Sequence, residues 1–349
     1  MTASSANVAD PSSTALGSTI FARLHPTTYL ARFLDNAIRP DGRSFDAFRD
    51  VSVGVSTIET AQGSAIVRYG NSTIIAGVKG EFIDISDEED VQQTADIDEA
   101  EENEMQTDKQ KSSRSIGLGP IDKRSLVVGV DLTPMSSARF KSGPPGEEAQ
   151  VLASRLMRSF EVCPPFSADS LNVQGSSLRW CLFVDLVCLS YDGNLLDACT
   201  LAVNSALNDT KLPNAQFDDQ GLICSSEESE AKPLSLRSFP QTFTFGIVEG
   251  THLLSDPNAF ESTMISASIT ITLDSMKLGT DEDLVGVQCS GRCSALITTE
   301  EARQAEVNGR KEGSSNNLRI QDEELAKVCL IRARRHCAQV KKAMQSAQR

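Results

Sequence analysis

Apolar and polar residues alternate in short runs between residues 51 and 78, and glycines separate the runs. A period of two with glycine at the breaks favours β-strands joined by hairpin turns. Similar runs recur later in the chain, and residues 178–189 form a nearly continuous apolar stretch that indicates a buried strand. We predict further strands over residues 126–132, 242–248, 251–254, 263–273 and 284–288.

Helical patterns occupy four other segments. Residues 147–160 place apolar side chains on one face, as an amphipathic helix does. The last helix, residues 321–344, has acids near its start and lysines near its end, which matches the helix dipole. The other two predicted helices cover residues 27–36 and 197–208. Because the strands cluster and the helices are few, the pattern indicates an α+β fold with mixed or antiparallel sheets and a C-terminal helix.

Three segments follow neither period. Residues 1–26 are dominated by small polar side chains, and we expect them to be disordered. Residues 84–120 read as an acidic, solvated insertion, and residues 298–319 as a second, polar insertion. The sequence therefore predicts one domain over residues 27–349 that carries two insertions.

The negative charge of the chain is concentrated in the first insertion. The formal net charge is −15, and twelve acids with no lysine or arginine lie between Asp84 and Asp108. The rest of the chain therefore carries only about −3, the difference between these two values. The low isoelectric point comes from an insertion, so it does not argue against a nucleic-acid partner.

Motifs for membranes, metals and nucleotide cofactors are missing from the sequence. We find neither a run of about 18 apolar residues nor a signal-peptide pattern, and we expect no membrane contact. Cys289 and Cys293 have no matching second pair for zinc, and the three histidines lie far apart, so we expect neither a metal nor a cofactor. Apolar surroundings indicate reduced, buried thiols at Cys181, Cys188 and Cys199.

One loop, residues 136–150, combines charge with a stiff backbone. Arg139 and Lys141 precede the sequence Gly-Pro-Pro-Gly at residues 143–146, which can continue neither a strand nor a helix. Acids then open the next helix, where they favour the positive end of its dipole. Taken alone, this pattern fits a solvated turn as well as a binding loop.

Several short motifs occur in an order that resembles the RNase PH family, and most closely the catalytically silent RNase PH-like subunits of the eukaryotic RNA exosome ring. The resemblance covers about residues 27–297 and the final helix. The motifs that carry it are Arg39-Pro40-Asp41-Gly42-Arg43, Gly63-Ser64-Ala65, Gly70-Asn71-Ser72-Thr73, Gly77-Val78-Lys79 and Tyr191–Ala198. The resemblance implies an RNase PH-like fold.

Active family members split RNA with inorganic phosphate, and the chain departs from them at the phosphate cradle. Their strand-to-helix junction reads Asp-Gly-Gly-Thr-Arg, whereas this chain has Asn194, Leu195 and Leu196 after Asp192-Gly193. An arginine stands five residues before the helix glutamine in active members, and here that position is Pro145. Leucine and proline side chains neither donate hydrogen bonds nor carry charge, so we expect no phosphate cradle.

The family's catalytic carboxylates are also missing. Active members place two aspartates six residues apart, where this chain has Glu261 and Ala267. Asp185, Asp192 and Asp197 form another set of carboxylates that could suggest catalysis. However, Asp192 fits a turn, and Asp197 suits a helix N-cap. We therefore expect no catalytic residue and no enzymatic activity.

The resemblance implies a structural role in RNA metabolism. It implies that the chain helps to build the hexameric exosome ring, supporting rRNA maturation, RNA surveillance and mRNA turnover in the nucleus, nucleolus and cytoplasm. Implied partners are other RNase PH-like ring subunits, cap subunits with RNA-binding domains, a hydrolytic exonuclease and RNA in the channel. Arg139 and Lys141 are candidate RNA contacts. Arg43 is another candidate, although it could equally brace the N-terminal segment.

Two alternatives remain open on the sequence. The chain could be an active phosphate-dependent 3′-to-5′ exoribonuclease, alone or jointly with a neighbour. It could also be a free-standing RNA-binding protein, but we expect the exposed strand edges of this fold to need covering by neighbours. The sequence does not distinguish among the silent ring paralogues.

Overall fold

The computed structural model describes residues 20–84, 125–173, 175–218, 221–225, 231–250, 252–280, 282–291 and 322–347. The chain divides into two compact units. The first unit comprises Met1–Phe48, Thr244–Ile269 and Cys289–Cys329, and the second comprises Arg49–Phe243, Thr270–Gln288 and Leu330–Arg349. The single domain expected over residues 27–349 stays a prediction. Most of both predicted insertions lies outside the described residues.

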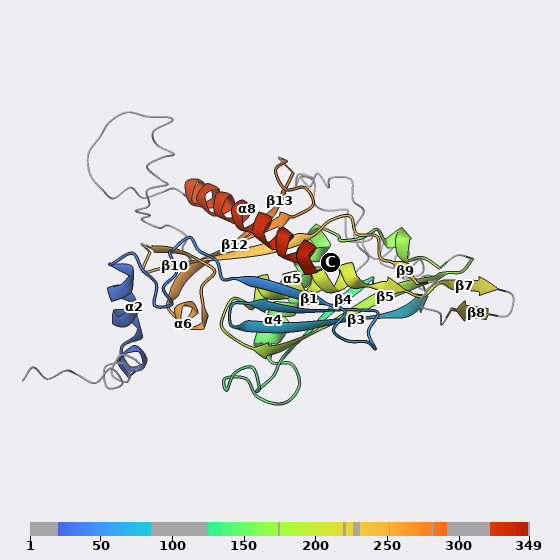
Figure 1. The fold of residues 1–349 in the computed structure, drawn as a ribbon, viewed down its shortest axis with the longest axis horizontal. Helices are drawn as coiled ribbons and strands as arrows, with labels where there is room; N and C mark the ends of the chain where they lie inside the picture. Colours follow the sequence, from blue (N-terminus) through green and yellow to red (C-terminus); the bar gives the residue numbers. More distant parts are fainter. Residues whose placement is uncertain are drawn as a thin grey trace, which may run out of the picture. The chain divides into compact units, whose positions relative to one another are not determined.

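A five-stranded sheet forms the centre of the second unit (Figure 1). Its strand order is β1-β2-β3-β5-β4, and all neighbours are antiparallel except β4 and β5, which are parallel. The sheet is therefore mixed, as predicted. Its strands are β1 (Val51–Val55), β2 (Gly63–Tyr69), β3 (Ser72–Asp84), β4 (Leu126–Leu132) and β5 (Leu178–Ser190). The predicted acidic insertion begins one residue too early, because Asp84 is still part of β3.

The turn between β2 and β3 needs glycine at its first position. Tyr69 pairs with Ser72, so only two residues form the turn. Gly70 has a positive φ of 59°, and a Cβ atom there would lie 2.5 Å from Cδ of Arg49. Backbone conformation and space therefore both select glycine.

Two helices pack on the sheet of the second unit. Helix α5 (Leu195–Asp209) packs against β1, β2, β3 and β5, and α4 (Glu147–Val162) packs against β4 and α5. All positions of α5 from Leu195 to Leu207 are buried, which explains why this helix consists largely of small and apolar residues. Both predicted helices are confirmed, with ends shifted by one or two residues.

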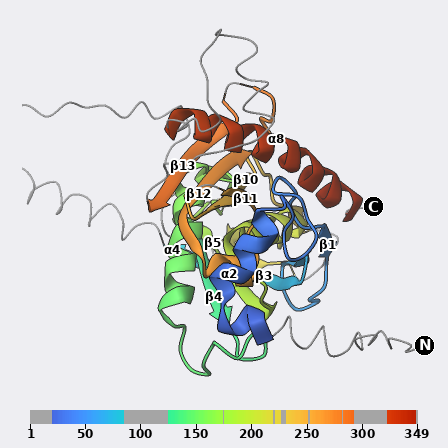
Figure 2. The same ribbon diagram turned by 90° about the vertical axis from the view of Figure 1, so that its left-hand side faces the viewer.

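The second sheet has the order β11-β10-β12-β13. Its strands are β10 (Pro240–Val248), β11 (His252–Ser255), β12 (Ile265–Asp274) and β13 (Leu284–Gly291). The final helix, α8 (Asp322–Ala347), is drawn in red in Figure 2. Five apolar residues spaced along it are buried: Leu325, Cys329, Ala333, Cys337 and Val340. The four predicted strands and the C-terminal helix are confirmed.

The first unit has its own small core. Helix α2 (Pro26–Leu34) buries Leu30 and Leu34, and the short helix α6 (Ala259–Ser262) follows β11 in the chain. The buried cluster comprises Leu30, Leu34, Val248 and Leu254, with Phe45, Phe260, Met264 and Ile265 packed against it.

The expectation of disorder up to residue 26 is wrong for its last part. Residues 20–24 are helical, and α2 itself begins at Pro26. The Phe21 ring lies 6.2 Å from the Tyr29 ring, and the Arg32 guanidinium lies 4.8 Å above it. These contacts join positions too far apart for a local composition argument to detect. Residues 1–19 lie outside the described residues.

Four very short strands were not predicted. Strand β6 (Lys211–Leu212) pairs with β9 (Lys232–Pro233), and β7 (Ala215–Asp218) pairs with β8 (Gly221–Cys224). Strands of two to four residues are too short to show an alternating pattern.

The buried thiols agree with the sequence. Cys181, Cys188 and Cys199 are all buried. Burial raises the pKa of Cys199 well above its ordinary value and that of Cys163 to about 11, so these thiols stay protonated and unreactive at neutral pH.

Candidate functional site

The junction between β5 and α5 is where the family resemblance leads us to expect no phosphate-holding groups. Gly193 and Asn194 both have positive φ, 75° and 45°, and Asn194 is the N-cap of α5. The helix then begins with Leu195 and Leu196, which are only 9% and 6% exposed. The leucine side chains are buried, so these two positions of the helix present neither a hydroxyl nor a charge.

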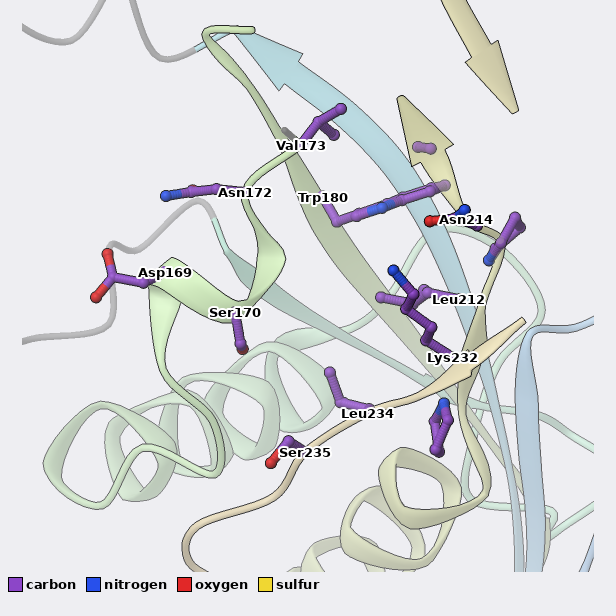
Figure 3. A pocket seen from close by; sticks show the side chains of 13 residues that line it. Asp169, Ser170, Asn172, Val173, Trp180, Leu212, Asn214, Lys232, Leu234 and Ser235 are labelled. Carbon is purple, nitrogen blue, oxygen red and sulfur yellow. The ribbon is translucent and has the colours of Figure 1, made fainter. Parts of the chain in front are cut away.

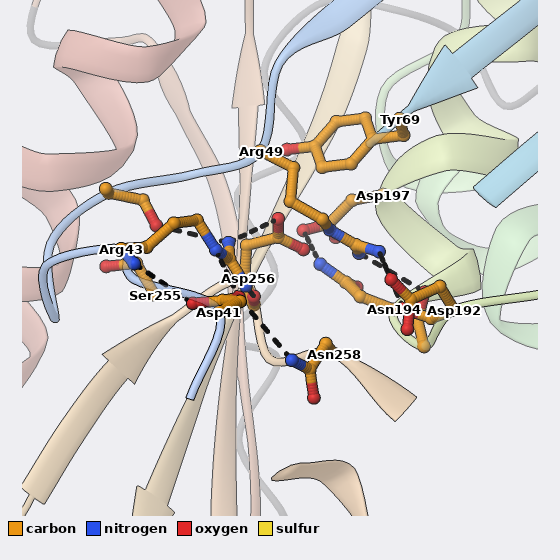
Figure 4. Close-up of polar contacts among 12 residues, drawn as sticks. Asp41, Arg43, Arg49, Tyr69, Asp192, Asn194, Asp197, Ser255, Asp256 and Asn258 are labelled. Carbon is orange, nitrogen blue, oxygen red and sulfur yellow. Dashed lines mark hydrogen bonds and ion pairs between the residues drawn. The ribbon is translucent and has the colours of Figure 1, made fainter. Parts of the chain in front are cut away.

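Arg49 holds this junction in place. Its guanidinium donates hydrogen bonds to the backbone oxygens of Asp192, at 2.6 Å, and Gly193, at 3.3 Å. It also lies 5.3 Å from the centre of the Tyr69 ring (Figure 4). Ser72 adds a second brace, because its hydroxyl accepts from the backbone N–H of Asp192 at 3.0 Å. A cation and a hydroxyl are thus present, but both are used to fix the loop.

An internal carboxylate lies in the first turn of α5. The Asn194 amide donates to Oδ2 of Asp197 at 2.7 Å, and Asp197 is fully buried (Figure 4). A carboxylate at this place stabilises the positive end of the helix dipole. Asp197 is three residues inside the helix, so its expected N-cap position is wrong. The N-cap position is taken by Asn194, whose left-handed backbone is better tolerated by asparagine than by most side chains.

The Gly-Pro loop is fastened through Arg139. Its guanidinium donates to Oε1 of Glu148 at 2.5 Å and to the Tyr191 hydroxyl at 3.0 Å. It also lies 5.2 Å from the ring centres of Phe140 and Tyr191. Despite these contacts, 44% of the Arg139 side chain is exposed. The structure therefore presents a cation at the surface in a defined position.

Lys141 lies two residues further along the same loop and is exposed. Across the described residues, no hydrogen bond or ion pair engages its ammonium group. The loop thus offers one braced and one unbraced cation, both open to solvent.

Tyr191 connects the loop to the junction. Burial raises the pKa of the Tyr191 hydroxyl above its ordinary value, and the opposing charge of Arg139 only partly offsets this. The phenol is therefore neutral at physiological pH and accepts the Arg139 hydrogen bond through its oxygen. The sequence placed Tyr191 in a motif but gave it no role, because its partner lies 52 residues away.

Pro145 is the residue at which the sequence comparison with the family expects an arginine. It is exposed, and its backbone oxygen accepts a hydrogen bond from the Gln150 amide at 3.0 Å. The helix glutamine is thus satisfied by the turn that precedes it. Together with the two leucines of α5, Pro145 leaves these positions of the second unit without a guanidinium or hydroxyl for phosphate.

Glu261 was expected from the family resemblance at a carboxylate position, and in the first unit both of its carboxylate oxygens accept hydrogen bonds. It forms a buried ion pair with Arg39, in which neither side chain is exposed. Its Oε1 accepts from Nε of Arg39 at 2.8 Å, and its Oε2 accepts from the backbone N–H of Asn258 at 2.9 Å. The Asn258 side chain in turn caps the N–H of Glu261. Ala267, the second position, is 3% exposed.

Arg43 braces the first unit. It donates to Asp41 at 2.7 Å and pairs with the buried Asp256 at 3.3 Å, and only 15% of its side chain is exposed (Figure 4). Burial raises the pKa of Asp41, but the hydrogen bonds from Arg43 outweigh this and lower it overall. These contacts support the bracing role considered for Arg43, while its contact with RNA stays a prediction.

The described residues contain neither a metal-binding cluster nor a membrane-spanning helix. Within the described ranges, we find no cluster of three or more metal-ligating side chains. The helices of those ranges include none that is long and apolar enough to cross a membrane.

Comparison with known proteins gives a consistent result. The model of the RNase PH family, described as "3′ exoribonuclease family, domain 1", matches residues 47–213. The chain is 30% identical over 260 residues to the exosome complex component rrp43 of Schizosaccharomyces pombe, which covers 74% of this chain and 84% of the relative. It is also 30% identical over 246 residues to Rrp42 of Thermococcus gammatolerans, covering 70% and 78%.

Solved structures give the same fold. An archaeal exosome core subunit superposes with a TM-score of 0.58 at 25% identity, covering 92% of this chain and 98% of that one. A subunit from the structure of the Archaeoglobus fulgidus exosome with RNA bound to the active site gives 0.56 at 27% identity, covering 82% and 93%.

Proposed function

The chain belongs to the RNase PH family as an RNase PH-like component of the exosome core, and on this premise we propose that it is a non-catalytic subunit that builds the ring and guides RNA. One observation carries the non-catalytic part. The first turn of α5 holds two buried leucines and an internal carboxylate instead of phosphate-binding groups.

The remaining positions support the same conclusion. Phosphorolysis needs donors and cations aimed at the attacking phosphate and the developing charge. At the family's positions this chain has Pro145, Leu195 and Leu196, and Glu261 is engaged by Arg39. Removing one such electrostatic interaction typically costs about 3 kcal/mol of transition-state stabilisation, and several are missing together here.

The purified chain should therefore release no nucleoside diphosphate from RNA in the presence of inorganic phosphate. The assay incubates the full chain with oligoadenylate and phosphate and separates ADP by chromatography. An active RNase PH serves as the positive control. Phosphate-dependent release of ADP above the buffer blank would show that the chain retains the family's activity.

RNA guidance is assigned to the loop of residues 136–150. Arg139 and Lys141 are exposed on a stiff backbone, and phosphate charge gives affinity without regard to sequence. The acids at the start of α4 prevent this helix end from serving as an anion site, so the loop cations carry the proposed contact.

Changing Arg139 and Lys141 to glutamate should weaken RNA binding by the assembled exosome core on the order of tenfold. The slope of log K against log salt should fall by about 1.4, or ~0.7 for each phosphate that is no longer neutralised. Fluorescence anisotropy with single-stranded RNA measures both quantities. The matched control changes Lys211 and Arg237, two other exposed cations of the second unit, to glutamate. If both double variants bind alike, the loop is not where RNA binds.

We extend the proposal to the partners and the cellular location of the protein. Its partners would include cap subunits with RNA-binding domains and a hydrolytic exonuclease, besides the ring neighbours and RNA. It would act in the nucleus, the nucleolus and the cytoplasm. These assignments are supported by the family resemblance, and co-purification with mass spectrometry tests them.

A further inference from the structure

A cavity of about 440 Å³ opens on the second unit, and none of its lining residues belongs to the β5–α5 junction or to the loop of residues 136–150 (Figure 3). Its deepest lining residues are Val173, Trp180 and Leu212, which are 4%, 8% and 7% exposed. Asp169 and Lys232 lie at the rim, on different segments of the chain. The cavity thus combines an apolar floor with a polar rim, as ligand sites commonly do.

The floor is rigid because Trp180 is held on one side. Its ring lies 3.9 Å, centre to centre, from the Phe82 ring on the neighbouring strand. Gly80 lies so close that a Cβ atom there would be 2.9 Å from Cε3 of Trp180. The Phe82 ring and the Gly80 backbone therefore position the indole from within the chain itself.

An apolar hairpin continues from the wall of the cavity. Asn214 and Ala215 line the cavity, and the chain runs directly from them into the β7–β8 hairpin. Phe217 pairs with Leu222 across this hairpin, and they are 48% and 37% exposed. Ile223 is 55% exposed. A two-stranded hairpin is only marginally stable alone in water, and exposed apolar side chains mark interaction surfaces. We therefore expect a partner molecule to cover this hairpin.

The charge and the backbone of this surface indicate what covers it. Asp169 and Lys232 contribute one charge of each sign, which gives no cationic field for an RNA backbone. Both strands of the hairpin have an outer edge that no other strand of the described chain occupies. An open strand edge beside a cavity with an apolar floor matches the way in which extended peptides bind, with backbone pairing for affinity and a pocket for one side chain.

We propose that the cavity and the β7–β8 hairpin bind an extended segment of a partner protein. A large apolar side chain of that segment enters the cavity over Trp180, and an acidic residue beside it meets Lys232. This surface lies outside the proposed RNA loop, and the inference does not depend on the proposed function.

The test uses the full chain and a phage-displayed library of dodecapeptides without tryptophan. Trp180 is the only tryptophan of the chain, so its fluorescence reports directly on the cavity. Selected peptides should share an apolar residue next to an acid, and their synthetic forms should change the Trp180 emission saturably. Changing Phe217 and Ile223 together to serine should weaken binding about tenfold, and Lys232→Glu should weaken it about fivefold.

The matched control is Val162→Ser, which removes a 61% exposed apolar side chain from α4. It should bind the peptides as the parent chain does. Selection that yields no peptide able to change Trp180 emission would overturn the proposal, as would equal binding by the control and the Phe217/Ile223 variant. If the serine variant fails to fold, an unchanged affinity of Lys232→Glu still refutes the acidic pairing. Oligouridylate changing the same emission at lower concentration would assign the surface to RNA instead and overturn the proposal.

Discussion

Replacing Arg39 with alanine should lower the free energy of unfolding by about 3–5 kcal/mol, because it leaves a buried carboxylate without its partner. Arg39 is fully buried and pairs with Glu261. Its guanidinium also donates to the backbone oxygens of Ser255, at 2.7 Å, and Asp256, at 3.1 Å. Alanine would leave these acceptors unsatisfied in addition to the charge. Urea titration followed by circular dichroism measures the change.

An exposed ion pair provides the control. Lys277 lies 3.4 Å from Glu282, and their side chains are 37% and 62% exposed. Because solvent screens such a pair, Lys277→Ala should change stability by less than about 1 kcal/mol. A similarly small effect of Arg39→Ala would contradict the buried pair. Glu261→Gln should also destabilise the protein, since it leaves the Arg39 charge buried and uncompensated.

This pair also bears on function. The acid at Glu261 could be taken from the sequence as the remnant of a catalytic pair, since one family carboxylate position still carries an acid. In the structure, both carboxylate oxygens of Glu261 accept hydrogen bonds, one from Arg39 and one from the backbone N–H of Asn258. Arg39 lies 222 residues away in sequence, and the sequence alone assigned no role to this residue. No local periodicity encodes such a contact, so only the folded chain reveals it.

The sequence was most informative where structure is local. Alternation and glycine predicted β1, β2 and β3, and the pattern of α4 predicted that helix to within two residues. It was least informative where elements are very short, as in β6 and β9, or where ring contacts stabilise a segment, as around Phe21.

The same distinction between local and non-local features applies to the candidate site. The absence of phosphate-binding groups at Leu195 and Leu196 was expected from comparing these side chains with the family's motif, and it stays a prediction. The cavity at Trp180 could not be predicted, because its lining comes from four separate stretches of the chain. Nor could the role of Arg49, whose acceptors lie about 143 residues away.

Arg49→Ala should destabilise the second unit by about 3 kcal/mol, because two backbone oxygens lose a charged donor and Arg49 is only 7% exposed. The effect should concentrate at the junction. We expect the amides of residues 192–196 to exchange with deuterium at least about tenfold faster, since ~1.4 kcal/mol of local stability corresponds to a factor of ten. Hydrogen exchange with mass spectrometry measures this segment directly.

Two further variants separate geometry from charge. Arg49→Lys keeps the charge but replaces a planar fork by a single ammonium group, which cannot hold both oxygens in the same way, so it should recover only part of the protection. Arg139→Ala removes an exposed arginine that contacts the neighbouring Tyr191, and it should leave the exchange of residues 192–196 nearly unchanged. Equal exchange in Arg49→Ala and Arg139→Ala would mean that the junction is held by its own turn and by Ser72. The junction between β5 and α5 would then owe its shape to backbone conformation rather than to the arginine that contacts it.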